Sequence, residues 1–369
     1  MRVALYNLTT TTAYGGVESF VWDLANQLAA RNYEVTVIGG DGSRREGSAT
    51  VTVATFPFVS RTWFSRIPGL ARAYAERKLL ERLSLAWRAI PYLIRGKFDI
   101  IHIQKPYDLL PALIAARFSG AKVILGCHGE DFYRGDRWLA TRVAGAVSCS
   151  QYNAQTVMKR YPIKVDVIYN GIDTAIFCPP AHPITLAATP LRVLFVGRLQ
   201  PWKGVDTAIR AIALTPHATL QIAGDGEQRQ ALEALVAELQ LSDRVTFLGS
   251  VPRQTLPAIM HNSHVLVATS YASETFGIGL VEAQSCGLPV IASRFGGFVE
   301  VVAEGVTGRF FAPKDATDLA AQFQFLIENP AVRQQYATAA PTWAAQFAWP
   351  AVTDRVTQAY TAALQRGQH

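Results

Sequence analysis

The sequence predicts an α/β protein made of two Rossmann-like domains, each a doubly wound parallel sheet, that face a cleft. Three observations predict this class. Short β-branched runs alternate with segments of helical period, which is typical of parallel strands connected by helices. The alternation stops once, in a proline-rich stretch, and then restarts. The length of 369 residues suits two domains at about 150 residues each.

The first domain is expected to span residues 1–175. Its strands are predicted at residues 2–6, 34–38, 50–54, 99–103, 122–126, 145–148 and 165–169, with helical patterns between most of them. Within residues 60–97, a helical stripe is expected to pack on the sheet. It consists of Leu80, Leu83, Trp87, Ile90 and Ile94, and Pro91 is expected to end or kink this helix near Ile90.

Residues 176–190 hold four prolines and no clear period, so we expect a linker there. The second domain is expected to span residues 191–349. Its strands are predicted at residues 192–196, 219–223, 244–248, 264–269 and 289–292, and its helices at 205–214, 227–239, 255–262 and 278–286. Ligands of such sheets bind at the carboxyl ends of the strands, which is where the candidate residues below lie.

The basic charge lies on one segment. Residues 60–97 hold seven Arg and two Lys against two Glu, a net of +7, so the rest of the chain sums to zero. A nucleic-acid binder is excluded, because its basic residues would not be confined in this way. Two interpretations remain: a packed helix with a solvated basic face, or peripheral contact of residues 60–97 with an anionic membrane.

The four cysteines, Cys127, Cys149, Cys178 and Cys286, form no CxxC pair and no short regular spacing. We therefore expect reduced thiols in a cytoplasmic protein, not a disulfide framework or a thiolate metal site. The amino terminus resembles a short strand and not the core of an export signal. No stretch reaches about 18 uncharged apolar residues, so no membrane span is expected.

Paired glycines, Gly15 and Gly16, precede the first predicted helix. They would let the backbone approach a phosphate at the helix start, although a simple tight turn is an equal alternative. The G-x-G-x-x-G fingerprint of a dehydrogenase is missing at this junction, so that class is a poor fit.

The loop after the first strand of the second domain carries Gly197, Arg198 and Lys203. An Arg fork and a Lys point charge at the carboxyl edge of a sheet suit a diphosphate, whose charge grows as it departs. Two cations on a polar loop are more often simply solvated.

Two glutamates, with seven residues between them, flank a predicted loop-to-helix junction. Between Glu274 and Glu282 lie Phe276, Gly277, Ile278 and Gly279, so the helix start offers free N–H groups to an anion. The carboxylates themselves would repel a phosphate and are better suited to grip the hydroxyls of a sugar or ribose. The alternative is an ordinary helix with surface acids.

Taken together, these motifs resemble those of the GT-B retaining glycosyltransferases of family 4. The resemblance rests on Gly-Gly-Val-Glu at residues 15–18 and on FVGRLQPWKGVDTAIRAI, IAGDGEQR, VTFLGSV, ETFGIGLVEAQSCGLPVIAS and GGFVEVV in the second half. It spans nearly the whole chain and is most specific from 191 to 311. It implies that the last helix, at residues 350–369, packs back on the first domain.

The resemblance also implies roles for individual residues. Arg198 and Lys203 match the diphosphate-binding pair, Glu274 the contact to the donor sugar and Glu282 the contact to the ribose. Gly15 and Gly16 match a loop that closes on the donor, and His128 matches a histidine near the reaction centre; on its own, His128 could equally be a loop imidazole. Val251 falls where the family reads the base. The sequence departs from the family at Gln284, Ser285 and Val299, and only the last adjoins the donor loop.

The implied reaction is transfer of a sugar, with retention, from a UDP- or GDP-sugar to a hydroxyl of a glycan, lipid-linked or small-molecule acceptor. No D-x-D motif is present, so we expect no metal site and no cofactor. A sugar-nucleotide epimerase, a phosphorylase of the same fold and a non-catalytic nucleotide-sugar-binding protein remain as alternatives.

Overall fold

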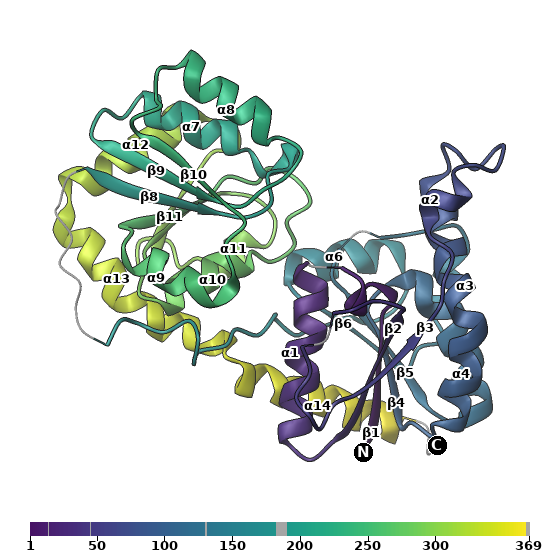
Figure 1. Cartoon of the computed structure of the whole chain (residues 1–369). Coiled ribbons are helices and arrows are strands. Elements are labelled where there is room, and N and C mark those ends of the chain that lie inside the picture. Colours follow the sequence, from purple (N-terminus) through teal and green to yellow (C-terminus); the bar gives the residue numbers. More distant parts are fainter. Residues whose placement is uncertain (14, 45, 130, 182–189, 367–369) are drawn as a thin grey trace. The chain divides into compact units, whose positions relative to one another are not determined.

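The computed structural model describes residues 1–13, 15–44, 46–129, 131–181 and 190–366. The chain divides into two compact units. Unit 1 comprises Met1–Gly171 and Trp349–His369, and unit 2 comprises Ile172–Ala348. Each unit is built around one parallel sheet flanked by helices (Figure 1).

The sheet of unit 1 has the strand order β3-β2-β1-β4-β5-β6-β7, and every pair is parallel. The strands are β1 (Arg2–Tyr6), β2 (Glu34–Gly40), β3 (Thr52–Phe56), β4 (Ile100–Ile103), β5 (Lys122–Cys127), β6 (Gly145–Ser148) and β7 (Asp166–Val167). All seven predicted strands are present, although β7 has only two residues. The central strands are buried along nearly their whole length, as expected for a sheet covered on both faces.

Helices cover both faces of this sheet. They are α1 (Gly16–Ala30), α2 (Arg61–Phe64), α3 (Tyr74–Arg95), α4 (Leu109–Ser119), α5 (Asp136–Ala140), α6 (Gln151–Arg160) and α14 (Trp349–Gln365), with 3-10 turns η1 (Leu8–Thr11) and η2 (Pro106–Asp108). Apolar side chains of α1 and α14 share one hydrophobic cluster, and those of α3, α4 and α6 share another. The doubly wound architecture predicted from the sequence is therefore present.

The final helix, α14, is part of unit 1 although it follows the whole of unit 2 in the chain. The ring of Trp349 lies 5.5 Å from that of Phe20 on α1. On the same helix, the hydroxyl of Tyr360 lies 2.8 Å from Nδ1 of His102 in the middle of the sheet. Both contacts are buried, so α14 completes the core of unit 1.

Unit boundaries differ from the predicted ones at the linker. Unit 2 begins at Ile172 and not after residue 190. The start of the predicted linker packs on unit 2, because the carbonyls of Phe177 and Cys178 accept hydrogen bonds of 2.6 and 2.8 Å from Ser285 and His261. Residues 182–189 of the predicted linker lie outside the described part of the chain.

The sheet of unit 2 has the order β10-β9-β8-β11-β12-β13, again with parallel pairs. Its strands are β8 (Leu191–Val196), β9 (Ala218–Ala223), β10 (Val245–Gly249), β11 (Val265–Ala268), β12 (Val290–Ser293) and β13 (Gly308–Phe311). Five were predicted. The sixth, β13, was missed because its residues, GRFF, begin with Gly and Arg and include no β-branched residue.

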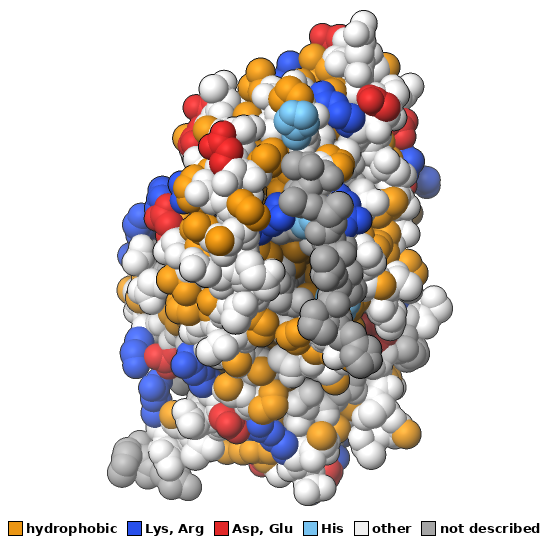
Figure 2. All heavy atoms as spheres, turned by 90° about the vertical axis from the view of Figure 1, so that its left-hand side faces the viewer, with side chains coloured by type: hydrophobic (Ala, Val, Ile, Leu, Met, Phe, Trp, Pro, Cys, Tyr) orange, Lys and Arg blue, Asp and Glu red, His pale blue; other side chains and the backbone are white. Residues whose placement is uncertain are grey.

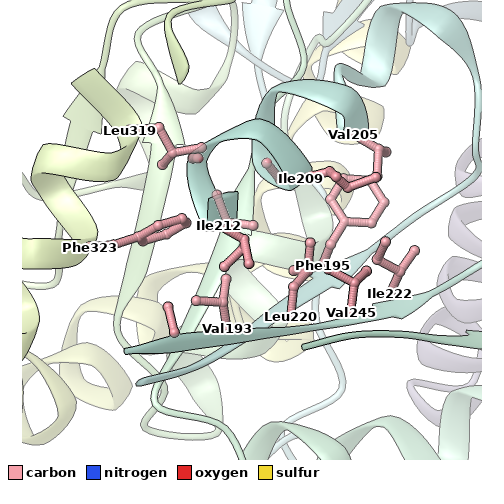
Figure 3. Close-up of a cluster of buried hydrophobic side chains, with 14 of the residues drawn as sticks. Val193, Phe195, Val205, Ile209, Ile212, Leu220, Ile222, Val245, Leu319 and Phe323 are labelled. Atoms are coloured by element: carbon pink, nitrogen blue, oxygen red, sulfur yellow. The ribbon is translucent and has the colours of Figure 1, made fainter. Parts of the chain in front are cut away.

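The helices of unit 2 are α7 (Val205–Ala213), α8 (Arg229–Glu238), α9 (Leu256–His261), α10 (Ile278–Ser285), α11 (Phe298–Val301), α12 (Ala316–Glu328) and α13 (Pro330–Ala344), with 3-10 turns η3 (Pro201–Lys203), η4 (Arg253–Thr255) and η5 (Ala345–Phe347). Figure 3 shows side chains of α7 and α12 meeting those of β8 and β9 above one face of the sheet. Phe195 and Ile209 lie in this cluster. This core holds the strand ends in fixed positions.

The predicted packing face of α3 is wrong. Trp87, at the centre of the predicted stripe, is 82% exposed, and the other four members are only partly buried. The face that packs on the sheet instead consists of Lys78, Glu81, Arg82, Leu85, Ala86, Ala89 and Leu93. Two of its cations are buried because each meets a carboxylate from another element: Lys78 pairs with Asp131, and Arg82 with Asp108.

Of the two outcomes predicted for Pro91, an end of the helix near Ile90 is wrong, because α3 continues through Pro91 to Arg95. The proline is on the exposed side of the helix. Among the described residues, no helix combines the length and the apolar character needed to cross a membrane.

Candidate active site

The cation loop of unit 2 connects β8 to α7 at the carboxyl edge of the sheet. Gly197 and Arg198 line a cavity of about 260 Å³ together with Gly224, Asp225 and Val251, which follow β9 and β10. Three residues predicted to bind the donor, Gly197, Arg198 and Val251, are thus brought to one cavity at the strand ends.

Lys203 and Glu274 form an ion pair. Nζ of Lys203 lies 2.6 Å from Oε2 of Glu274, and the hydroxyl of Ser270 donates to the same oxygen at 3.2 Å. Both side chains are largely but not fully buried. Sequence reasoning placed these residues on different parts of a ligand and did not anticipate that they contact each other 71 positions apart.

Gly204 fixes the backbone that carries Lys203. Its φ is +60°, and a Cβ there would lie 2.6 Å from the carbonyl oxygen of Thr269, at the end of β11. The hydroxyl of Thr269 in turn donates to the carbonyl of Lys203 at 2.6 Å. A side chain at position 204 would therefore push the loop away from the sheet, which explains the glycine.

The segment before α10 places an open helix start beside this pair. Gly277 caps the helix with φ +94°, and a Cβ there would lie 2.6 Å from the ring of Phe298. Phe276 is buried and meets the ring of Phe347 at 5.7 Å, which anchors the segment. Ile278 opens the helix, and no atom lies within 4 Å of the Cβ position of Gly279. The side of α10 at Gly279 is therefore open, which leaves room for an anion near the first N–H groups of the helix.

Glu282 is buried, so it is not an ordinary surface acid. Its Oε1 lies 3.4 Å from Nη2 of Arg253, whose guanidinium also lies over the ring of Phe177 at 5.4 Å. Sequence reasoning missed Arg253, because it stands alone in a polar turn and nothing in the local pattern marks it as a partner of Glu282.

In unit 1, Gly15 and Gly16 lie at the start of α1, with Gly15 as its cap. Space beside Gly16 is open, with no atom within 4 Å of its Cβ position. The hydroxyl of Thr9 donates to Glu18 in the first turn at 2.5 Å, which ties η1 to the helix. The start of α1 is thus open beside Gly16, but the carboxylate of Glu18 lies against Gly15, so a phosphate there would meet a negative charge.

His128 follows β5 and is held by two neighbours. Its Nε2 lies 2.8 Å from Oε1 of Gln104, an atom that can only accept, so this nitrogen carries the proton. Its ring lies 4.8 Å from that of Phe20 on α1. Burial, and then the charge of Lys105, lowers the pKa of His128 to about 3, so the imidazole is neutral at neutral pH. Glu130 of the same motif lies outside the described residues.

Near His128 the structure shows a charge cluster that sequence reasoning missed. Asp131 pairs with both Lys78 and Lys105. Burial alone would raise the pKa of Asp131, but the two lysines hold it below its usual range. The three residues come from α3, the end of β4 and the end of β5, so only the fold brings them together. The described residues contain no group of three or more His, Cys, Asp and Glu that could hold a metal ion.

Lowering the pH from 7 to 5 is expected to destabilise unit 1 by about 2 kcal/mol for each of His102 and His128. Burial lowers the pKa of both to about 3, well below the ordinary value of 6.5. The unfolded chain therefore takes up protons below pH 6.5 that the folded chain refuses, so stability falls as the pH falls. Urea unfolding at the two pH values measures this.

The matched variant is His102→Gln, which keeps a hydrogen-bonding side chain but does not titrate. Between pH 7 and 5, the free energy of unfolding of this variant should fall by about 2 kcal/mol less than that of the wild type. An unchanged pH dependence in this variant would contradict the assignment.

The two doubly wound units, with cations, carboxylates and a helix start gathered at the strand ends of the second, define the GT-B class of glycosyltransferases. Solved structures agree on the fold. The Anabaena protein HepE in complex with UDP matches with a TM-score of 0.80 at 22% identity, covering 98% of this chain and 100% of that one. Sucrose-phosphate synthase from Thermosynechococcus elongatus matches with a TM-score of 0.82 at 22% identity, covering 99% of each chain.

Sequence comparisons show the family to which the chain belongs. Residues 14–176 match the model "Glycosyltransferase Family 4" and residues 182–343 match "Glycosyl transferases group 1". A D-inositol 3-phosphate glycosyltransferase from Mycolicibacterium smegmatis is 34% identical over 96% of this chain and 88% of its own length. The enzyme of that name from Mycobacterium marinum is also 34% identical, but the match covers 55% of this chain and 46% of that one.

The chain therefore belongs to glycosyltransferase family 4. It is a glycosyltransferase of the GT-B type that uses a nucleotide sugar.

Proposed function

We propose that the enzyme transfers a sugar from a UDP- or GDP-sugar to an acceptor hydroxyl with retention at the anomeric carbon and without a metal ion or other cofactor. The observation that carries the proposal is the grouping of Lys203, Glu274 and Ser270 beside the open start of α10. It combines a cation for the departing phosphate with a carboxylate that can hold sugar hydroxyls.

In the proposed donor complex, Arg198 and Lys203 hold the diphosphate, with the N–H groups of Ile278 and Gly279 as further donors. Lys203 would then be shared between Glu274 and a phosphate oxygen. Oε1 of Glu274, which neither Lys203 nor Ser270 contacts, can accept from sugar hydroxyls. Glu282, buried and anchored by Arg253, would accept from the ribose, and Val251 would lie beside the base.

A front-face route explains best how the configuration at the anomeric carbon would be retained. Oε2 of Glu274 already accepts from both Lys203 and Ser270, which lowers its value as a nucleophile. In the front-face route, the acceptor oxygen forms its bond to the anomeric carbon on the side from which the diphosphate leaves. The acceptor proton passes to the departing phosphate oxygen, so no protein base is required.

His128 is proposed to hydrogen-bond the donor sugar near the reacting carbon. Its neutral state supports this role, because an uncharged ring does not repel the positive charge that develops on the sugar. Unit 1 would also bind the acceptor. Two relatives are named for D-inositol 3-phosphate, and the two lysines that share Asp131 leave a net positive charge in unit 1 that suits an acceptor carrying a phosphate.

Transfer is expected to proceed at an undiminished rate in the presence of EDTA. The protein's own cations and the start of α10 supply the positive charge that a metal would otherwise provide. The measurement is release of UDP or GDP from a panel of nucleotide sugars with an acceptor, with and without EDTA. Activity that EDTA abolishes and Mn²⁺ restores would contradict metal independence, and isomerised donor in place of transfer would contradict the reaction itself.

Exposed aromatic and basic residues of α2, of α3 and of the segment between them support the further proposal that the enzyme contacts an anionic membrane peripherally, on the cytoplasmic face of that membrane. We call these residues the aromatic–basic surface. It consists of Trp63, Tyr74 and Trp87, which are 51%, 55% and 82% exposed, with Arg66, Arg72, Arg88 and Arg95, which are also exposed. Aromatic rings favour the headgroup region, and each basic residue near an anionic surface contributes about 1 kcal/mol.

Flotation with vesicles of phosphatidylglycerol is expected to carry the enzyme upward at low salt. Replacing Trp63 and Trp87 together by Ser should abolish this, because the rings provide the apolar part of the contact. The control is Leu214→Ser, which removes an apolar side chain of similar exposure from unit 2. Flotation that is absent, insensitive to salt or unchanged in the double variant would contradict the membrane proposal.

A further inference from the structure

Unit 2 contains a second cavity, of about 520 Å³, away from the strand ends that carry the proposed donor site. It lies where strands of the sheet begin. Its walls come from the residues just before β11 and β12, from the ends of α9 and α10, and from α13. A volume of this size is typical of sites for small organic ligands.

His264, at the start of β11, contributes a buried donor to this cavity. It is 6% exposed, and the backbone N–H of Arg192 donates to its Nδ1 at 2.9 Å. The proton of the neutral ring must therefore be on Nε2. Burial, together with Arg333 and Arg192, lowers the pKa of His264 to about 4, which keeps the ring neutral at neutral pH. Nε2 is buried and has no hydrogen-bond partner within the part of the chain that is described.

Arg333, from α13, contributes a second donor. Its Nη1 is buried and also has no hydrogen-bond partner among the described residues. No Asp or Glu is among the described residues that line the cavity. Figure 2 shows the side of the molecule over α12 and α13, where basic and His side chains lie among hydrophobic ones. Two buried donors without an acceptor are costly, and each has almost no accessible surface in this structure, so a ligand would satisfy them only once both side chains turn toward the cavity.

We infer that this cavity binds a small organic anion, whose phosphate or carboxylate oxygens accept from Nη1 of Arg333 and Nε2 of His264. The remaining lining suits the rest of such a molecule. Gln334 and Thr338 offer polar groups, while Leu288 and Pro341 offer apolar walls. This site is separate from the donor diphosphate site, because its residues come from the opposite ends of the strands.

One helix, α10, extends from the proposed donor site to this cavity. The start of α10 follows Gly277 in the donor loop, and its other end leads into Cys286 and Gly287, which line the cavity. The helices α10 and α13 pack against each other. An anion held by Arg333 would therefore lie near the carbonyl end of α10, which disfavours negative charge, so the positive charge of Arg333 must outweigh this repulsion.

Calorimetric titration with inorganic phosphate, glucose 6-phosphate and citrate tests the inference, and it distinguishes a phosphate from a carboxylate ligand. At least one probe is expected to bind the wild type at millimolar concentration or tighter. Arg333→Met should weaken this binding at least tenfold, because a charge-assisted hydrogen bond is lost. Arg210→Met, which removes an exposed cation elsewhere in unit 2, should leave it unchanged.

Two further variants keep the inference falsifiable. Gln334→Glu places a carboxylate at an exposed position of the cavity lining and should also weaken binding at least tenfold, even if Arg333→Met fails to fold. Lys203→Met removes a cation of the donor site and should leave binding within twofold of the wild type. Binding that disappears in Lys203→Met but persists in Gln334→Glu would assign the anion to the donor site and overturn the inference, as would no binding of any probe.

Discussion

Replacing Lys203 by Ala is expected to lower kcat/KM for the donor by about 30-fold to 1,000-fold, which corresponds to ~2–4 kcal/mol of lost transition-state stabilisation. Nζ of Lys203 is held in place by Glu274 and by the fixed loop that ends at Gly204. A cation that is already positioned stabilises the departing diphosphate without reorganising, so its removal should affect the chemical step strongly. Steady-state kinetics with varied donor measure the change.

The ion pair between Lys203 and Glu274 makes a second variant necessary. Lys203→Ala also leaves Glu274 without its cation, so part of the loss could come from an uncompensated carboxylate. The double variant Lys203→Ala/Glu274→Gln removes that charge as well, and its comparison with Glu274→Gln alone separates the effect of Lys203 from the effect of Glu274 on the donor sugar. Arg210→Ala is the control for charge at an exposed position of unit 2. A Lys203→Ala enzyme that keeps nearly the wild-type kcat/KM would show that the diphosphate binds elsewhere.

Replacing Arg82 by Met is expected to destabilise unit 1 by about 3–5 kcal/mol. Arg82 and Asp108 form an ion pair in which both side chains are almost completely buried, and Arg82 also donates to Asn7 at 3.1 Å. Burial raises the pKa of Asp108 to about 6 even with Arg82 in place, so without the guanidinium the carboxyl must either take up a proton or stay charged in the core, and both cost stability. Urea unfolding measures the change in the free energy of unfolding.

Two further variants serve as comparisons for the stability of Arg82→Met. Arg88→Met removes an exposed cation from the same helix and should change stability by less than about 0.5 kcal/mol. The double variant Arg82→Met/Asp108→Asn removes both charges and should recover part of the loss. If Arg82→Met is no more destabilising than Arg88→Met, the buried pair does not contribute as its geometry indicates.

The fold could be predicted because strands and helices leave a local signal. Runs such as residues 122–126 and 145–148 are apolar and bounded by turn residues, and they are strands in the structure. The face of α3 could not be predicted in this way. Its periodic apolar stripe includes the exposed Trp87, while Lys78 and Arg82 are buried, because their partners Asp131 and Asp108 come from elsewhere in the chain. The amphipathic pattern of a helix does not reveal that a cation on it pairs with a carboxylate far away in the sequence.

The same limit applies to the candidate site. The loop glycines and the four charged residues of the donor motifs could be found from their spacing near strand ends. The contacts between them could not, because Lys203 follows β8 and meets Glu274 after the adjacent strand β11, 71 positions away, and Glu282 meets Arg253, which no motif marks. The buried donors of His264 and Arg333 were missed entirely, since each stands in a segment without a motif.

The place of α14 in the core of unit 1 has a consequence for the order in which the chain matures. During synthesis, the strands of unit 1 leave the ribosome first, but Trp349 and Tyr360, which complete its core, leave last. Unit 2 lies between them in the sequence and is complete before α14 is made. The domain that is translated first is therefore finished last, and its unfinished sheet must stay free of aggregation while the whole of unit 2 is translated.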